Sequence, residues 1–456
     1  MHEHGHTQER GKELLLKVFK HQKVDHIPWV PFAGVHSGFL KKYTATDVLT
    51  NPSKLQECLI EVNKLYHPDG QPILFDLQVE AEILGCGLSW SDKNPPMVIS
   101  HPLEDDPLVP TKLPKVTDGR LPLILKVMKQ VKSKIGETTG LFGLTTGPLT
   151  LASHLRGTKI YLDLFQNREF VDELLEYTTQ VCMKMNDLYI SAGMDVIAVV
   201  DPVVSQISPQ MFDDHLIRRF QKIFSEIKKE KTFSSFFVCG DATKNLPLIA
   251  NTNPNSMFVD ENIDMVQAMK IVKPKNIVLG GNIPLTTVML FGTQQDNMKY
   301  VINLIDKVGK ENLVIAPGCD MPYDIPPDNV IGVFQAIKEP ELIRKSLTNY
   351  EMTEIDIDIK LPDYQNLSKP LVEVFTIDSA TCAACGYMLA TALEAKKEFG
   401  DRIKLVEYRF IKRESVARAK KLNIKHLPCI LINGKLKWSS IIPNKEEMLN
   451  EIKRVL

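Results

Sequence analysis

Short apolar runs recur along the chain, and a helix-length segment follows each of them. The runs lack the alternation of apolar and polar positions, which is typical of parallel strands covered on both faces. Segments such as 168–193, REFVDELLEYTTQVCMKMNDLYISAG, have an amphipathic pattern and predict the crossover helices. The runs are residues 27–34, 72–76, 140–147, 195–202, 234–240, 256–262, 276–284 and 312–319.

Eight such units predict an α/β fold, a (β/α)8 TIM-type barrel. A doubly wound sheet alternates in the same way and stays open as an alternative. The polar positions favour the barrel, because they lie at or just past the carboxyl ends of the runs, which form the catalytic face of that fold. They are His36, Asp76, Thr146, Asp201, Cys239, Asp260, Asn282 and Cys319.

Length and charge narrow the classes of function. A chain of 456 residues exceeds one ordinary core and predicts a large domain with a smaller one. Its 55 Lys and Arg nearly balance 56 Asp and Glu, which argues against nucleic-acid or anionic-membrane partners. No apolar run reaches the roughly 18 residues of a membrane span, and the N-terminus lacks a secretory pattern, so we expect a cytoplasmic protein.

Eight cysteines are too sparse for a disulfide scaffold and indicate metal binding or redox chemistry. Cys239 and Cys319 close two of the runs, each beside a glycine, so they could converge over the barrel mouth. A catalytic zinc typically has three protein ligands and an open position, where an incoming thiol would lose its proton. Two buried cysteines that act as small apolar side chains are the alternative.

Several long motifs carry a family resemblance over roughly residues 8–345. They are FDLQVEAEILGCGLSW, TGPLTLASHLRG, AGMDVIAVVDPVVSQISPQMF, FVCGD, VDENIDM, GGNIP and APGCDMPYDIPPDN. This part resembles the uroporphyrinogen decarboxylase superfamily, and within it the methylcobamide:coenzyme M methyltransferase branch. The resemblance implies a barrel, a zinc ion at its mouth, and methyl transfer from a methylated corrinoid protein to a zinc-bound thiolate.

The resemblance assigns the two cysteines, Cys239 and Cys319, to the zinc. The family's third ligand, a histidine, is replaced by Phe237. Another side chain must complete the site, or the chain has no catalytic zinc. The side chains considered are His36, which we favour because imidazole is a normal zinc ligand, and Glu80, Glu82 and Asp201.

The function predicted is methyl transfer between a methyl-corrinoid partner protein and a small acceptor, namely coenzyme M, another thiol or a folate. Asp76 and Asp201 would orient ligands or carry protons. One alternative is a decarboxylase-like lyase that uses Asp76 without zinc. It is weakened because no arginine lies between Arg10 and Arg120 to bind a multiply carboxylated porphyrinogen. The other is a non-catalytic module that binds a corrinoid or another ligand, or serves redox chemistry.

A change in composition predicts three segments: a barrel over residues 1–345, a polar linker over 346–369 and a second domain over 370–456. The last segment contains Cys382 and Cys385 as Cys-x-x-Cys, between an apolar run and a helical pattern. This order resembles a small thioredoxin-like α/β domain, in which a helix N-terminus lowers the pKa of the exposed thiol.

The resemblance matches Pro428 to the cis-proline of that fold and ILINGKLKW to its closing hairpin. Cys429 is interpreted as a strand residue rather than a third redox partner. The second domain would keep thiols or the acceptor reduced, or dock a partner.

Overall fold

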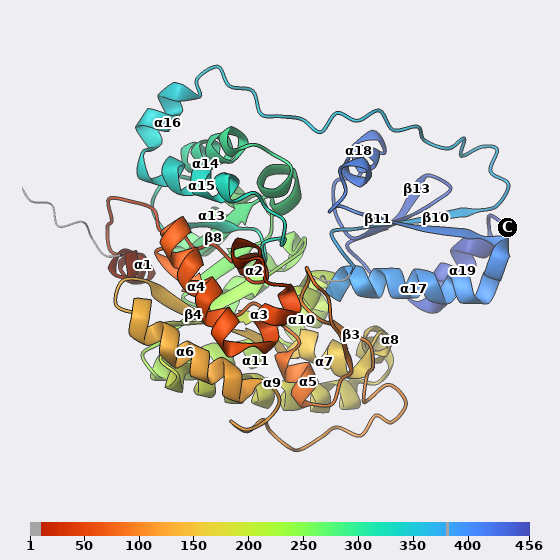
Figure 1. Cartoon of the computed structure of the whole chain (residues 1–456). Coiled ribbons are helices and arrows are strands. Elements are labelled where there is room, and N and C mark those ends of the chain that lie inside the picture. The colour runs from red at the N-terminus through yellow and green to blue at the C-terminus, as the bar shows by residue number, and fades with distance from the viewer. Residues whose placement is uncertain (1–10, 380–382) are drawn as a thin grey trace, which may run out of the picture.

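The computed structural model describes residues 11–379 and 383–456, and its N-terminal part is built on a parallel sheet (Figure 1). Seven strands lie in the order β1-β4-β5-β6-β7-β8-β9, and every neighbouring pair is parallel. The predicted parallel α/β architecture is therefore confirmed. The strands are β1 (Gly70–Pro72), β4 (Gly140–Thr146), β5 (Val196–Val200), β6 (Phe233–Val238), β7 (Ser256–Val259), β8 (Val278–Ile283) and β9 (Leu313–Pro317).

The first two predicted runs differ from the structure. Within 27–34 only Trp29 pairs, through a parallel bridge to Ile315 of β9. The Trp29 carbonyl also accepts hydrogen bonds from the amides of Asp69 and Gly70, so this segment lies between the two edge strands. The run 72–76 ends as a strand at Pro72. Prolines in both runs lack the N–H that a ladder needs, which explains the short pairing.

Helices cover the outside of this sheet, and the predicted helix 168–193 is α9 (Arg168–Ser191) (Figure 1). The inner side is aromatic, because alternate strand residues point to the same face. Five rings meet there, all of them buried: Phe32, Phe75, Phe142, Phe237 and Phe258. The covering helices are α4 (Pro52–Tyr66), α6 (Leu121–Ile135), α9, α11 (Ile217–Lys229), α13 (Met265–Val272), α14 (Gln294–Val308) and α15 (Pro327–Lys338).

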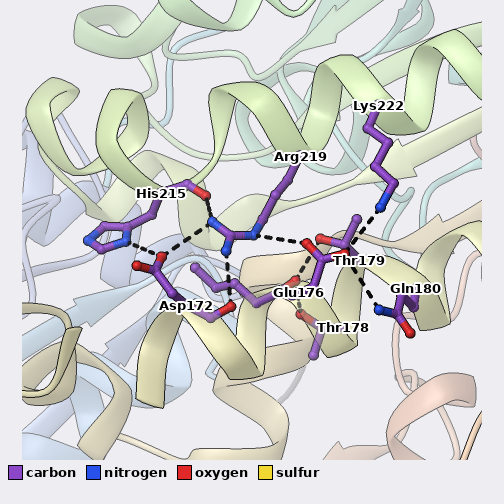
Figure 2. A network of polar contacts seen from close by, with 9 residues as sticks. Asp172, Glu176, Thr178, Thr179, Gln180, His215, Arg219 and Lys222 are labelled. Atoms are coloured by element: carbon purple, nitrogen blue, oxygen red, sulfur yellow. Dashed lines mark hydrogen bonds and ion pairs between the residues drawn. The ribbon is translucent and has the colours of Figure 1, made fainter. Parts of the chain in front are cut away.

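A polar network joins α9 to α10 (Pro209–His215) and α11 (Figure 2). Arg219 donates to the carbonyl oxygen of Asp172 at 3.0 Å, and His215 Nδ1 lies 3.0 Å from the carboxylate of the same residue. Lys222 lies 3.1 Å from Glu176 one turn further along. These contacts fix the outer helices and have a structural role.

The C-terminal part is a mixed sheet in the order β11-β10-β12-β13. Helices α17 (Ala383–Phe399) and α19 (Lys445–Lys453) pack on one face, and α18 (Arg413–Lys421) packs on the other. Cys429 begins β12 and is buried, which confirms its interpretation as a strand residue. The peptide bond before Pro428 is cis. The strands are β10 (Leu371–Thr376), β11 (Lys404–Arg409), β12 (Cys429–Ile432) and β13 (Lys435–Ser439).

Residues 350–363, within the predicted linker, form no helix or strand. They pass from α16 (Pro340–Ser346) to the C-terminal sheet along the outside of both parts (Figure 1). The backbone amide of Thr353 donates to Asp296 at 2.7 Å, which ties the segment to the N-terminal part. Among the described residues no helix has the length and apolarity that a membrane crossing requires.

Candidate active site at the sheet mouth

The structure brings Cys239 and Cys319 together at the carboxyl edge of the parallel sheet, here called the mouth. Cys239 directly follows β6, and Cys319 follows β9 by two residues. Although 80 residues separate them, their Cα atoms lie 6.0 Å apart and the sulfur atoms are joined as a disulfide. The carboxyl ends of parallel strands share one edge, which explains how distant residues meet.

Phe237 occupies the position at which the family resemblance implies the third metal ligand. It lies two residues before Cys239 on β6, so both side chains point to the same face of the strand. Its ring is fully buried, with centroids 4.7 Å from Phe32 and 5.8 Å from Phe258. The position that would offer an imidazole beside the cysteines is part of the aromatic core.

His36 does not supply the missing ligand. Its Nδ1 lies 3.0 Å from the Tyr323 carbonyl oxygen, and its Nε2 lies 2.7 Å from the Tyr66 hydroxyl. Since a carbonyl only accepts, Nδ1 donates and the Nε2 lone pair receives the tyrosine proton. Burial lowers the pKa of His36 to about 4, so the ring is neutral.

A zinc centre is therefore not supported by the donor set. Zinc requires at least three protein ligands. Within residues 11–379 and 383–456, no group of three His, Cys, Asp or Glu side chains could hold a metal ion. The two sulfurs fit half of a zinc site, and the other half is missing.

Asp201, predicted to be catalytic, lies at the N-terminus of α7 (Pro148–Arg156). Its carboxylate accepts hydrogen bonds from the amides of Leu149 and Thr150 at 2.9 and 3.0 Å, and from the Thr150 hydroxyl at 2.6 Å. Burial raises the pKa of Asp201 to about 7, and these bonds oppose the rise. The residue positions a helix and is not free to meet a substrate.

Asp76, the other predicted acid, is paired. Arg120 Nη1 lies 2.6 Å from its carboxylate, and the same guanidinium bonds Glu82 at 2.6 Å. Glu80 accepts from the amide and the hydroxyl of Thr146 at 3.0 and 2.7 Å. These three carboxylates hold the loop after β1 to its neighbours.

A cavity of about 130 Å³ lies against the two cysteines. Three of its lining side chains are buried and end in polar atoms without a hydrogen-bond partner: Gln78 Oε1, His154 Nδ1 and Gln206 Oε1. Gln78 precedes α5 (Val79–Ile83), His154 lies on α7 and Gln206 ends η1 (Pro202–Gln206). These three residues are here called the polar triad.

Sequence reasoning missed the polar triad. All three residues lie inside the quoted family motifs, as FDLQVE, LASHLRG and VVSQIS. The available signal was a polar side chain two to seven residues past the end of a predicted strand run. Nothing local shows that a glutamine is buried without a partner, since that depends on the other elements.

Acidic side chains surround the same cavity. Asp260 and Asp320 line it, and burial raises the pKa of both carboxyls. Asp378 also lines it and lies 3.3 Å from Arg409. Lys93, the one lysine among the described lining residues, is exposed and lies 2.8 Å from Asp324.

The C-terminal part covers the mouth. Ile377, Asp378, Leu427 and Pro428 line the cavity from that side, opposite the cysteines. Three contacts fix this arrangement: the Tyr387 hydroxyl with Ser153 at 3.0 Å, His426 with Asp241 at 3.3 Å, and Arg413 with the Phe291 carbonyl at 3.0 Å. The two sheets thus enclose one site between them.

A wider groove of about 620 Å³ adjoins this cavity and shares Gln78 and His154 with it. The groove runs between α17 and β3 (Met97–Val98). Exposed apolar side chains flank it, including Met97, Ile99 and Leu393. It leads from the surface to Gln78 and His154 of the polar triad.

The predicted redox residues lie next to this groove only in part. Cys385 is in the first turn of α17 and is buried, and Gly386 and Tyr387 after it line the groove. Cys382 lies outside the described residues. The pairing of the Cys-x-x-Cys motif therefore stays a prediction.

Comparisons with known proteins agree on the N-terminal part. The family model described as Uroporphyrinogen decarboxylase (URO-D) matches residues 10–340. Methylcobamide:CoM methyltransferase MtbA of Methanosarcina acetivorans is 25% identical over 341 residues, which cover 73% of this chain and 98% of that protein. Methylcobamide:CoM methyltransferase MtaA of Methanosarcina barkeri is 27% identical over 298 residues, covering 64% and 85%.

Uroporphyrinogen decarboxylase of Nostoc punctiforme is 25% identical over 303 residues, covering 63% of this chain and 84% of that protein. A solved structure described as a methyltransferase from Methanosarcina mazei aligns with a TM-score of 0.67 at 24% identity. It covers 73% of this chain and 99% of its own, which shows the same fold for the N-terminal part.

Proposed function

Since the chain belongs to the uroporphyrinogen decarboxylase family, we propose that it transfers a methyl group from a methyl-corrinoid protein to a small thiol bound at the mouth. Its similarity to methyltransferases named for methylcobamide and CoM supports this reaction. The observation that carries the proposal is the mouth cavity, which places a cysteine pair beside unpartnered polar groups at the carboxyl edge of the sheet.

In this reaction the acceptor thiol loses its proton and its sulfur bonds to the methyl carbon. The carbon–cobalt bond breaks at the same time, and its electron pair stays on the cobalt of the partner protein. Asp260 is the cavity carboxylate that we assign to hold the proton, because it lines the cavity and burial raises its pKa above the ordinary value of an aspartate. Zinc takes no part in this proposed step, since the described residues offer no third ligand for it.

The proposal is tested with methylcobalamin as donor and a small thiol as acceptor, following the loss of the cobalt–carbon absorbance. We expect transfer by the reduced full-length chain and a rate lower by on the order of tenfold in Cys239→Ser and Cys319→Ser, because both side chains line the cavity in which the acceptor thiol is proposed to bind. Cys58→Ser is the matched control, because Cys58 is a buried cysteine in α4, outside the cavity lining. Absence of thiol methylation by the wild-type chain would refute the proposed reaction.

The lyase alternative has less support. Its proposed acid, Asp76, is outside the cavity lining and is held by Arg120. Among the described lining residues no arginine is present to bind substrate carboxylates. The described lining residues therefore include neither the acid proposed for decarboxylation nor an arginine that would bind the substrate carboxylates.

We also propose that the C-terminal part is a dithiol domain that reduces the disulfide between Cys239 and Cys319. Its loops at Ile377 and Pro428 face that disulfide across the cavity. A Cys-x-x-Cys dithiol attacks the disulfide, both mouth thiols are released, and the motif becomes the disulfide. Two electrons and two protons move, and an external dithiol restores the motif.

This second proposal is tested by trapping thiols after a limiting dose of dithiothreitol. We expect the mouth cysteines to be reduced more slowly in Cys385→Ser than in the wild type, as read by mass spectrometry of alkylated peptides. Cys86→Ser serves as a matched control because Cys86 is buried in the N-terminal part. Equal rates in all three proteins would refute it.

A further inference from the structure

Three residues that line the mouth cavity each carry a buried hydrogen-bonding atom without a partner. Gln78 is 8% exposed, Gln206 5% and His154 2%, so water reaches them poorly. An unpaired polar atom in such a place destabilises the folded chain, because it has lost its bonds to water and gained none in return. Three such atoms on side chains that line one cavity indicate that a ligand completes the bonding.

Gln206 is close to the reactive edge of the sheet. Its Nε2 donates to Ser205 Oγ at 2.8 Å, which leaves Oε1 as the unsatisfied atom. A Cβ placed on Gly240, the residue after Cys239, would lie 2.7 Å from Ser205 Oγ and 3.9 Å from Gln206 Nε2. The polar triad and the cysteine pair therefore belong to one site.

The unsatisfied atoms define the complementary chemistry. Two are amide oxygens, which only accept hydrogen bonds. The third belongs to an imidazole that burial keeps neutral by lowering the pKa of His154 to about 3. A matching ligand must present N–H or O–H groups, and a group that can only accept leaves both oxygens unpaired.

The charges around the cavity also disfavour an anionic ligand. Asp260, Asp320 and Asp378 line it, while Lys93 faces solvent with 58% of its side chain exposed. Arg409 neutralises Asp378 from outside the lining. Among the described lining residues no buried cation is present, so a buried anion would be unpaired and costly.

We propose that Gln78, His154 and Gln206 bind the polar end of the methyl acceptor, and that this end is a neutral or cationic hydrogen-bond donor, such as a hydroxyl or ammonium group, and not a sulfonate. The inference rests on the proposed methyl transfer for the identity of the ligand as an acceptor. The acceptor inferred for this chain differs at its polar end from coenzyme M, which ends in a sulfonate and for which the relatives are named.

The methylated products test the inference without reacting with the disulfide. The probes are 2-(methylthio)ethanol, 2-(methylthio)ethylamine and 2-(methylthio)ethanesulfonate, which share one chain and differ at the polar end. Dissociation constants are measured with the full-length protein by ligand-observed NMR. We expect the alcohol and the amine to bind at least about tenfold more tightly than the sulfonate.

Variants assign the contact to the polar triad. We expect Gln78→Leu and Gln206→Leu each to weaken alcohol binding by about fivefold to tenfold. Gln206→Glu keeps the size of the side chain and should strengthen amine binding while weakening sulfonate binding. Gln210→Leu is the matched control, because Gln210 is an exposed glutamine on α10.

Sulfonate binding equal to or tighter than amine and alcohol binding would overturn the inference and leave methyl transfer intact. Binding of none of the three probes, or unchanged affinity in both glutamine variants, would overturn it as well. The expected order of affinities without turnover of methylcobalamin would support the binding inference and refute the proposed reaction, so the two failures are distinguishable.

Discussion

Phe237→His should create the metal site that this chain lacks. Phe237 points to the same side of β6 as Cys239, and Cys239 already lies beside Cys319. Reduction of the disulfide gives two thiols, and an imidazole at 237 adds a third donor from the adjacent position of the strand. Three such ligands meet the minimum for a catalytic zinc.

The change in the free energy of unfolding that we expect for Phe237→His follows from the burial of Phe237. Phe237 is fully buried and its ring lies 4.7 Å from that of Phe32, so a histidine loses apolar contact and brings unpaired nitrogens into an aromatic cluster. An unsatisfied buried polar group costs about 1–3 kcal/mol, and the lost apolar burial adds about 1 kcal/mol. We expect the free energy of unfolding to fall by about 2–4 kcal/mol without metal, and zinc at 100 times its Kd to restore about 2.7 kcal/mol.

The assay is urea unfolding of the reduced protein with and without zinc, together with zinc content by mass spectrometry. Phe142→His is the matched control: Phe142 is also fully buried against Phe32, at 6.2 Å, but the residue two positions later is Leu144. We expect similar destabilisation and no recovery with zinc. One tightly bound zinc in the wild-type chain, or no recovery in Phe237→His, would refute the reasoning.

Three further outcomes are expected. Burial raises the pKa of Asp201 from 3.8 to about 7, so between these pH values the folded chain holds a proton that the unfolded chain releases. The free energy of unfolding should therefore fall as the pH rises from about 4 to about 7. Asp201→Asn should remove that dependence in urea titrations. Arg120→Met should cost about 3–5 kcal/mol of stability, because it leaves the buried Asp76 carboxylate unpaired, whereas Lys93→Met at an exposed pair should cost about 0–1 kcal/mol; equal losses by denaturation would contradict this. Tyr387→Phe removes the buried bond to Ser153 and should speed hydrogen exchange in α17, while an unchanged rate would show that this bond does not hold the two parts together.

The apolar runs determined the sheet, because periodicity is a local property of the chain and parallel strands need no distant information to be apolar throughout. Cys239 and Cys319 could likewise be assigned to one edge, since every strand end of a parallel sheet lies there. The prolines in 27–34 and 72–76 could have shown that these runs pair only briefly.

Only the tertiary structure decided what the polar residues do. Asp201 and Asp76 are carboxylates at predicted strand ends, where catalytic acids are expected. In the structure Asp201 accepts hydrogen bonds from the first turn of α7, and Asp76 pairs with Arg120, 44 residues away. Gln78, His154 and Gln206 are likewise far apart in sequence, and they are functional candidates because one buried polar atom of each has no hydrogen-bond partner. Whether a buried polar group is satisfied depends on atoms brought together by folding, and a sequence pattern cannot contain that information.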